Sequence, residues 1–183
     1  MSAMNNRVDP RALNVQVLCK DAGRLEGEWS LTEMLRLHDS LFAKPADTAP
    51  VVWSAQGALQ SASGGEPEVR LQVQAEVAVT LQCQRCLQAM AHTLVVDRPF
   101  RFVRTEAQAE ALDEAAEEDV LVLPPRLDLH ELIEDELILA LPLVPRHAGA
   151  CPSPLPLAAD DLLDDEPAPN SFAALAALRG KPQ

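Results

Sequence analysis

The chain has 183 residues, of which 48% are hydrophobic and only 3% aromatic. Its formal net charge of -13 excludes a general nucleic-acid-binding surface, because proteins bind phosphates through Lys and Arg. The first ten residues lack the apolar segment of a signal peptide, and no apolar run approaches the ~18 residues of a membrane span. The sequence therefore predicts a soluble, cytoplasmic protein with an aliphatic core and reduced cysteines.

The N-terminal third predicts two strands and a helix. Apolar and polar side chains alternate over residues 12–19, which indicates a short strand. Ser30 and Glu33 have the spacing of a capping box, and the leucines that follow recur at helical intervals, so we expect a helix near 31–42. Alternation over residues 51–60 predicts a further strand.

The clearest periodicity lies in residues 69–82, where seven apolar side chains alternate with mostly polar ones. A period of two over this length predicts a long strand with one buried face. A second extended run, roughly 87–103, follows a tight segment that contains two cysteines. Residues 69–103 are therefore expected to form an antiparallel hairpin.

The C-terminal half predicts one further main helix. Residues 105–119 are acidic and rich in Ala, which indicates a loop or a weak helix. Asp128 and Glu131 repeat the capping spacing before an apolar stripe, so we expect a helix near 128–141, with His130 solvated in its first turn.

These elements together predict an α+β fold, in which an antiparallel sheet carries the long hairpin and two main helices pack on it. Residues 1–151 are expected to form a single domain. Residues 152–183, rich in Pro and acidic residues, predict a flexible acidic tail that ends in a short amphipathic segment.

Four side chains form a candidate metal site. Cys83 and Cys86 form a C-x-x-C turn, which brings two sulfurs close enough to share one ion, and His147 and Cys151 follow the predicted helix four residues apart. If that helix packs across the hairpin, a Cys3His zinc site closes. The alternative is that these are reduced thiols in a turn and a loop.

Dithiol chemistry is disfavoured at this motif. Redox-active C-x-x-C pairs lie at a helix N-terminus, where the helix dipole lowers the thiol pKa, whereas Cys83 and Cys86 stand between two predicted strands. Cys19 has no partner spacing and is expected to pack as a small apolar residue. No catalytic motif or phosphate-binding loop is present, so we expect no enzymatic activity and no small-molecule substrate.

A locally basic stretch in this acidic chain is the candidate contact site for RNA or a partner. It contains four arginines, interleaved near its end with two phenylalanines: Arg85, Arg98, Arg101 and Arg104. Arginines with aromatic residues bind phosphates and stack on unpaired bases. The alternative is that the arginines neutralise neighbouring acidic residues while the phenylalanines serve the core.

Three segments resemble the YceD family of large ribosomal RNA subunit accumulation proteins. They are VTLQCQRCL at 79–87, DLHELIEDELILALPLVPRH at 128–147 with the following Cys151, and NSFAALAALRG at 170–180, in the order of the family. The resemblance implies a bacterial, non-enzymatic factor needed for synthesis, processing or stability of 23S ribosomal RNA. It also implies, by motif position, that the two C-x-x-C cysteines, His147 and Cys151 are the candidate metal ligands.

The expected partner is therefore 23S rRNA or a large-subunit ribosomal protein. The alternative function is a zinc-stabilised adaptor that binds a basic ribosomal protein rather than RNA. An acidic factor suits a basic protein better than it suits a phosphate backbone.

Overall fold

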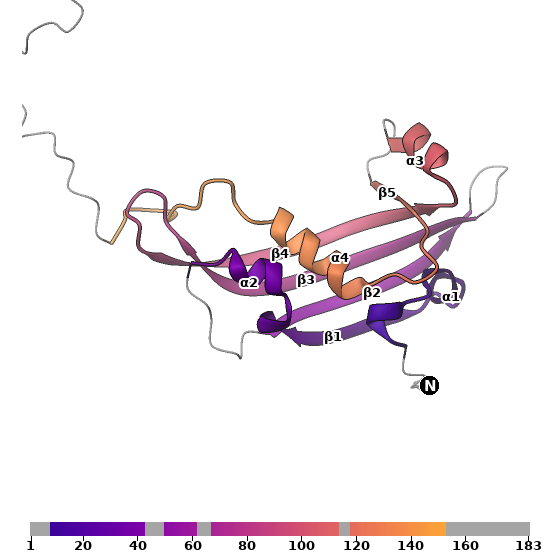
Figure 1. Ribbon diagram of the computed structural model, residues 1–183, viewed down its shortest axis with the longest axis horizontal. Coiled ribbons are helices and arrows are strands. Elements are labelled where there is room, and N and C mark those ends of the chain that lie inside the picture. Colours follow the sequence, from indigo (N-terminus) through magenta and orange to yellow (C-terminus); the bar gives the residue numbers. More distant parts are fainter. Residues whose placement is uncertain (1–7, 43–49, 62–66, 114–117, 153–183) are drawn as a thin grey trace, which may run out of the picture.

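Five strands form one twisted sheet, and helices lie across one of its faces (Figure 1). The computed structural model describes residues 8–42, 50–61, 67–113 and 118–152. The strands are β1 (Arg24–Ser30), β2 (Pro50–Gln60), β3 (Glu68–Gln82), β4 (Ala89–Val103) and β5 (Asp119–Val122). The helices are η1 (Pro10–Ala12), α1 (Val15–Lys20), η2 (Leu31–Glu33), α2 (Leu35–Asp39), α3 (Glu106–Asp113) and α4 (Leu129–Leu139).

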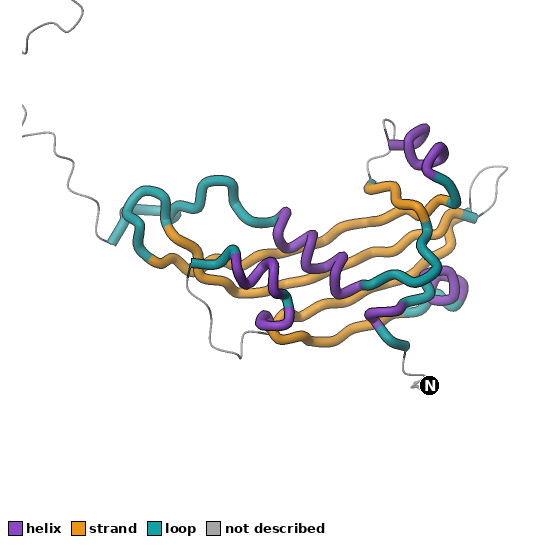
Figure 2. The backbone as a smooth tube through the Cα atoms, in the orientation of Figure 1, coloured by secondary structure: helices purple, strands orange, loops and turns teal. Residues whose placement is uncertain are grey.

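The predicted hairpin is confirmed. β3 pairs with β4 in antiparallel register from Val69 opposite Phe102 to Gln82 opposite Ala89, next to the turn that contains the cysteines. The two strands are the longest elements in Figure 2 and run the length of the sheet. The predicted strand at 51–60 is confirmed as β2.

The sheet is mixed, so the prediction of a purely antiparallel sheet is wrong at one edge. β1 to β4 are antiparallel neighbours, but β5 runs parallel to β4, with Phe100 opposite Asp119. The reason is the crossover: α3 separates the two strands in the sequence, and β5 then lies beside the C-terminal end of β4 and runs the same way.

The predicted strand at 12–19 is wrong. Asn14 caps a helix there by accepting a hydrogen bond from the backbone N–H of Val17, and Val15, Leu18 and Cys19 are buried on one side of α1. That spacing of three and four residues is helical. Gly57 of β2 admits this helix, because a Cβ at residue 57 would stand 2.9 Å from backbone atoms of α1.

The helix predicted near 31–42 is interrupted. The capping box of Ser30 and Glu33 is present, but it caps the 3-10 turn η2, and α2 begins only after Met34. Glu134 of α4 replaces a local cap, since its carboxylate accepts from the backbone N–H groups of Arg36 and Leu37 at 2.7 and 3.2 Å. Two helices about a hundred residues apart are thereby joined.

The helix predicted near 128–141 is confirmed as α4, with Asp128 as its N-cap, accepting from the N–H groups of His130 and Glu131. His130 is not solvated as predicted: it is 5% exposed, and its ring meets Trp29 edge-on at 4.8 Å. Its Nε2 has no hydrogen-bond partner in the described part of the chain.

The core lies between the sheet and the helices that cover it. It is aliphatic, with two phenylalanines of β4 and a stacked pair of Trp29 and Trp53 at 4.3 Å. The helical side of the core includes Leu37, Leu129, Ile133 and Leu137, together with the buried residues of α1. None of the described helices is long and apolar enough to cross a bilayer. The predicted tail, apart from Pro152, lies outside the described residues.

Candidate metal centre

The turn between β3 and β4 presents the first two candidate ligands. Cys83 extends the inward register of β3, and both it and Cys86 are buried. The turn closes through two backbone bonds, from the Leu87 N–H to the Cys83 carbonyl at 2.8 Å and from the Cys83 N–H to the Gln88 carbonyl at 2.9 Å. Leu87 adopts a left-handed φ of 59°, a conformation that lets the chain turn into β4 directly after the second cysteine.

The segment after α4 brings the other two ligands to this turn. Pro142 and Pro145 end helical structure there. The Gln84 N–H donates to the Pro145 carbonyl at 2.8 Å, and Arg85 donates to the Gly149 carbonyl at 3.3 Å. Two stretches that are about 60 residues apart in the sequence therefore lie side by side at one end of the sheet (Figure 1).

The structure brings Cys83, Cys86, His147 and Cys151 together, with their four ligand atoms within 4.8 Å of one another. The Sγ atoms of Cys83 and Cys151 are 3.9 Å apart, and Cys86 Sγ is 3.7 Å from His147 Nδ1. Ligands that surround one zinc ion tetrahedrally stand about 3.6–3.8 Å apart, given Zn–S of ~2.3 Å and Zn–N of ~2.0 Å. A disulfide requires ~2.05 Å, so this spacing fits a shared ion and not a covalent bridge.

The electrostatics of the turn favour a thiolate at Cys83. Burial opposes ionisation, but hydrogen bonds from the backbone N–H groups of His147, Arg85 and Cys86 outweigh it and lower the pKa of Cys83 to about 5. Burial raises the pKa of Cys151, as do its contacts with Cys86 and Cys83. One of the three sulfurs is thus prepared to bind a cation at neutral pH, since the thiolate is the form that ligates metals.

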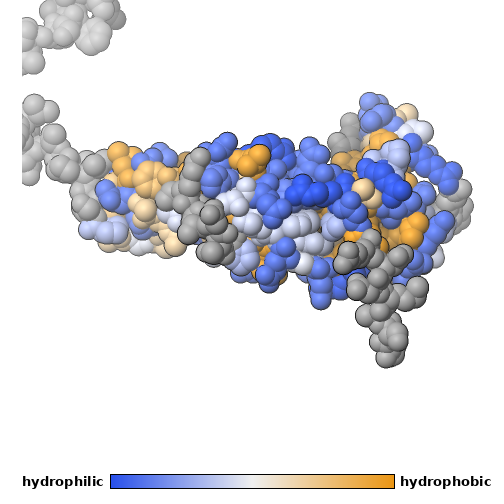
Figure 3. Space-filling view, turned by 60° about the horizontal axis from the view of Figure 1, so that its bottom comes forward, coloured by the Kyte–Doolittle hydropathy of each residue, from blue (hydrophilic) through white to orange (hydrophobic). Residues whose placement is uncertain are grey.

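Hydrophobic side chains gather at this end of the molecule (Figure 3). Leu87 of the turn and Leu143 and Val144 of the segment after α4 are exposed, Leu143 completely. Apolar side chains therefore flank the four ligands, beside the exposed Gln84 and Arg85 of the turn.

The four arginines of the predicted contact site do not come together. Arg85 lies in the cysteine turn, and nine residues of β4 separate that turn from Arg98, which is about 30 Å at ~3.3 Å per residue. Arg98 points to the face that α4 covers, where it meets Glu136, while Arg101 lies on the opposite face. Arg104 follows the end of β4, and its backbone N–H donates to Gln108.

Carboxylates engage two of these arginines, as the alternative interpretation of the basic stretch described, although the sequence did not identify which carboxylates. Arg98 pairs with Asp119 at 2.7 Å and with Glu136 at 3.5 Å, and Arg101 pairs with Glu68. Burial raises the pKa of Glu136, and Arg98 opposes that rise. The pairing partners lie 21 to 38 residues away in sequence, so the strand register and the packing of α4 bring them into contact.

Cys19, the fourth cysteine, stands apart from the cluster. It is buried beside β3 and its Sγ donates to the Arg70 carbonyl at 3.1 Å, and burial raises the pKa of its thiol. It packs as the small apolar residue that its lack of partner spacing predicted.

Fold and cluster together define an α+β protein whose longest hairpin ends in a candidate Cys3His metal centre. The chain matches the family model described as "Large ribosomal RNA subunit accumulation protein YceD" over residues 71–179, which is more than half of its length. The chain therefore belongs to the YceD family. The family description names an accumulation factor and no catalytic activity.

A relative from Haemophilus influenzae with the same description is 38% identical over 109 residues. The aligned part is 58% of this chain and 63% of the relative, so the similarity spans less than two thirds of the relative's length. No solved structure matches the chain significantly.

Proposed function

We propose that this protein is a non-enzymatic factor that supports the synthesis, processing or stability of 23S rRNA, and hence large ribosomal subunit biogenesis. The observation that carries the proposal is the family match over residues 71–179, whose description names accumulation of the large-subunit RNA. That match covers most of the hairpin, all of α4 and all four candidate ligands.

The ion pairs of the hairpin support contact with a basic ribosomal protein rather than directly with RNA. Phosphate binding requires cations that are free to displace counterions, and Arg98 and Arg101 already neutralise carboxylates. The chain carries 28 acidic against 15 basic residues, which repels a phosphate backbone and attracts a basic protein.

The four ligands suit a structural ion. A zinc ion held by Cys83, Cys86, His147 and Cys151 has four protein ligands and no open position for substrate, so its chemistry is to fix the turn against the segment after α4. This arrangement supports an adaptor whose fold is stabilised by metal.

Depletion of the protein in its own organism tests the role. We expect 23S RNA to fall relative to 16S RNA, and large subunits to fall relative to small subunits on a sucrose gradient. Re-expression of the wild-type chain restores both ratios. Unchanged ratios in depleted cells that normally express the protein contradict the proposed function.

A binding measurement separates the two kinds of partner. If RNA is contacted through the hairpin, Arg98→Gln with Arg104→Gln lowers RNA affinity and reduces its salt dependence, since each lost phosphate contact removes about 0.9 of the salt slope. The control pair, Arg11→Gln with Arg126→Gln, removes the same charge from exposed arginines outside the hairpin. Protein that binds no RNA at physiological salt supports the basic-protein partner.

A further inference from the structure

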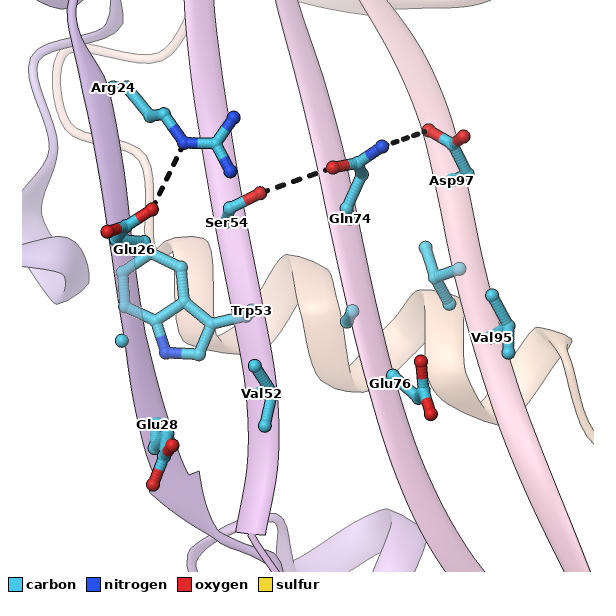
Figure 4. Close-up of a pocket in the computed structure, with 13 residues that line it drawn as sticks. Arg24, Glu26, Glu28, Val52, Trp53, Ser54, Gln74, Glu76, Val95 and Asp97 are labelled. Carbon is cyan, nitrogen blue, oxygen red and sulfur yellow. Dashed lines mark hydrogen bonds and ion pairs between the residues drawn. The ribbon is translucent and has the colours of Figure 1, made fainter.

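The face of the sheet opposite α4 is hollowed over β1 to β4 (Figure 4). The hollow has a volume of about 590 Å³. Figure 4 views the strands with α4 behind them, so the labelled side chains, apart from the buried Trp53, belong to alternating residues that project away from the core. No helix of the described residues covers this face in Figure 1.

One row of side chains crosses the hollow from strand to strand. The register places Glu28 opposite Val52, Val52 opposite Glu76, and Glu76 opposite Val95. Acidic and apolar groups therefore alternate along the row. Both valines are exposed on this face, Val52 by 49% and Val95 by 62%.

A second row, one side-chain repeat further along the strands, is polar. It runs from Glu26 through Ser54 and Gln74 to Asp97. Ser54 donates to Gln74 at 3.4 Å, and Gln74 donates to Asp97 at 3.3 Å, which fixes the middle of the row (Figure 4). Glu26 accepts from Arg24 at 3.1 Å.

The hollow is strongly negative. Its lining holds four carboxylates and one guanidinium, that of Arg24. In the described part of the chain, neither Glu28 nor Glu76 forms a salt bridge. Arg98 and Arg101 of the same sheet form salt bridges with other carboxylates. Glu28 and Glu76 lie two strands apart, about 10 Å, so they do not share one metal ion and each is left to meet a separate cation.

We propose that this hollow binds a Lys- and Arg-rich segment of a partner protein. Cations of the segment meet Glu28 and Glu76, and its aliphatic groups or the stems of its basic side chains cover Val52 and Val95. The face repels RNA through its carboxylates, and it repels a second copy of the chain, because a two-fold contact sets the same acidic residues against each other. The inference rests on the proposed contact with a basic protein and names its place.

The test uses full-length protein and a labelled 15-residue peptide that alternates Lys with Val, followed by fluorescence anisotropy at low and physiological salt. We expect Glu28→Lys with Glu76→Lys to weaken binding by about tenfold or more. Val52→Ser with Val95→Ser changes no charge and is expected to weaken binding less, by a few-fold, through the lost apolar contact.

A matched control changes the same amount of charge elsewhere. Glu110→Lys with Glu131→Lys replaces two exposed acidic residues, one on α3 and one on α4 across the sheet from the hollow, and is expected to leave affinity at physiological salt within about twofold, because surface charges beyond a Debye length are screened. Circular dichroism and thermal unfolding of each variant establish that the fold is retained. Equal weakening by both charge-reversal pairs overturns the proposal, as does tight binding of a 15-nucleotide single-stranded RNA to the same face.

Expression of each variant in depleted cells separates this inference from the proposed function. If the hollow is the docking site, the Glu28→Lys, Glu76→Lys variant fails to restore the ratio of 23S to 16S RNA, and the control variant restores it. Full restoration by both variants overturns the docking site and leaves the proposed function intact. If depletion itself does not alter the ratio, the proposed function fails. The peptide measurement alone then tests whether the hollow binds a basic segment.

Discussion

The two ends of the β3–β4 hairpin are stabilised by different chemistry. Where α4 crosses the sheet, β3 and β4 bury aliphatic and aromatic side chains beneath Ile133 and Leu137, in rows that Arg98 of β4 interrupts. At the turn, the same two strands extend past the helix and are fixed by backbone hydrogen bonds, Cys83 to Gln88 and Gln84 to Pro145, and by four polar ligands. A hydrophobic core thus sets the global stability, while the turn depends on a local polar cluster.

Removal of metal is the largest expected perturbation of the turn end. Protein purified without chelator should carry about one zinc per chain. Only the folded state brings the four ligands together, so zinc binding adds to the free energy of unfolding. When free zinc is a thousandfold above its dissociation constant, chelation should lower that free energy by about 4 kcal/mol. Circular dichroism of the sheet should persist, while hydrogen exchange accelerates at residues 83–88.

The control for the metal experiment is His147→Ala, which removes one ligand and leaves the core untouched. It should reduce bound zinc in elemental analysis without a loss of sheet signal. The finding of no zinc in wild-type protein, together with four titratable thiols in the folded state, contradicts the metal centre.

Truncation in the core should weaken the whole molecule instead. Ile133→Ala removes a fully buried side chain at the centre of α4, and such changes typically destabilise by about 2–5 kcal/mol. Leu139→Ala, on the same helix but 75% exposed, should change stability by less than ~0.5 kcal/mol. Urea unfolding measures both, and equal effects would show that α4 does not anchor the core.

Overfilling the contact between α1 and β2 should have the next largest effect. In Gly57→Ala the new methyl group meets backbone atoms of Leu18 and Cys19 at 2.9 Å, which cannot yield as a flexible side chain would, so about 1–3 kcal/mol is lost. Gly149→Ala, near the metal ligands, meets nothing within 4 Å and should be close to neutral. A neutral Gly57→Ala in thermal unfolding would contradict the close approach of α1.

The smallest expected effect is a pH dependence from His130. Burial lowers the pKa of this imidazole, with Arg11 adding to the shift and Asp128, Glu134 and Glu33 opposing it. The unfolded state then binds more protons, so the free energy of unfolding should fall as pH drops below about 6.5. His130→Leu should remove that part of the slope, measured by urea unfolding from pH 7.5 to 5.5, whereas an unchanged slope would assign it to other groups.

Sequence periodicity predicted the hairpin because seven apolar positions at period two admit no helical interpretation. It failed at residues 12–19, where a short run satisfies both periods and the cap at Asn14 decides for a helix. β1 was not predicted, since its inward positions are Leu25, Gly27 and Trp29, and a glycine interrupts the apolar pattern. β5 is four residues long, and its pairing depends on the crossover through α3.

In the candidate site, too, some features were predictable from the sequence and others were not. The C-x-x-C spacing predicted that Cys83 and Cys86 lie in one turn. The predicted helix, if packed across the hairpin, placed His147 and Cys151 close enough to that turn to bind the same ion. The ion pairs of Arg98 and Arg101 were not predictable, because each partner is selected by strand register or by the packing of α4. The row of Glu28, Val52, Glu76 and Val95 on the outer face was likewise not predictable, because it forms only when four strands are aligned in register.

The two pairs of candidate ligands are far apart in the sequence, so the ribosome synthesises one pair well before the other. His147 follows Cys86 by 61 residues, so at a translation rate of 5–20 residues per second the second pair emerges on the order of 3–12 s after the first. The nascent hairpin meanwhile presents two thiols alone, and the complete ligand set exists only after α4 has docked and carried its following segment back to the turn. If the four residues bind zinc, metal content measures completed folding rather than the amount of chain synthesised.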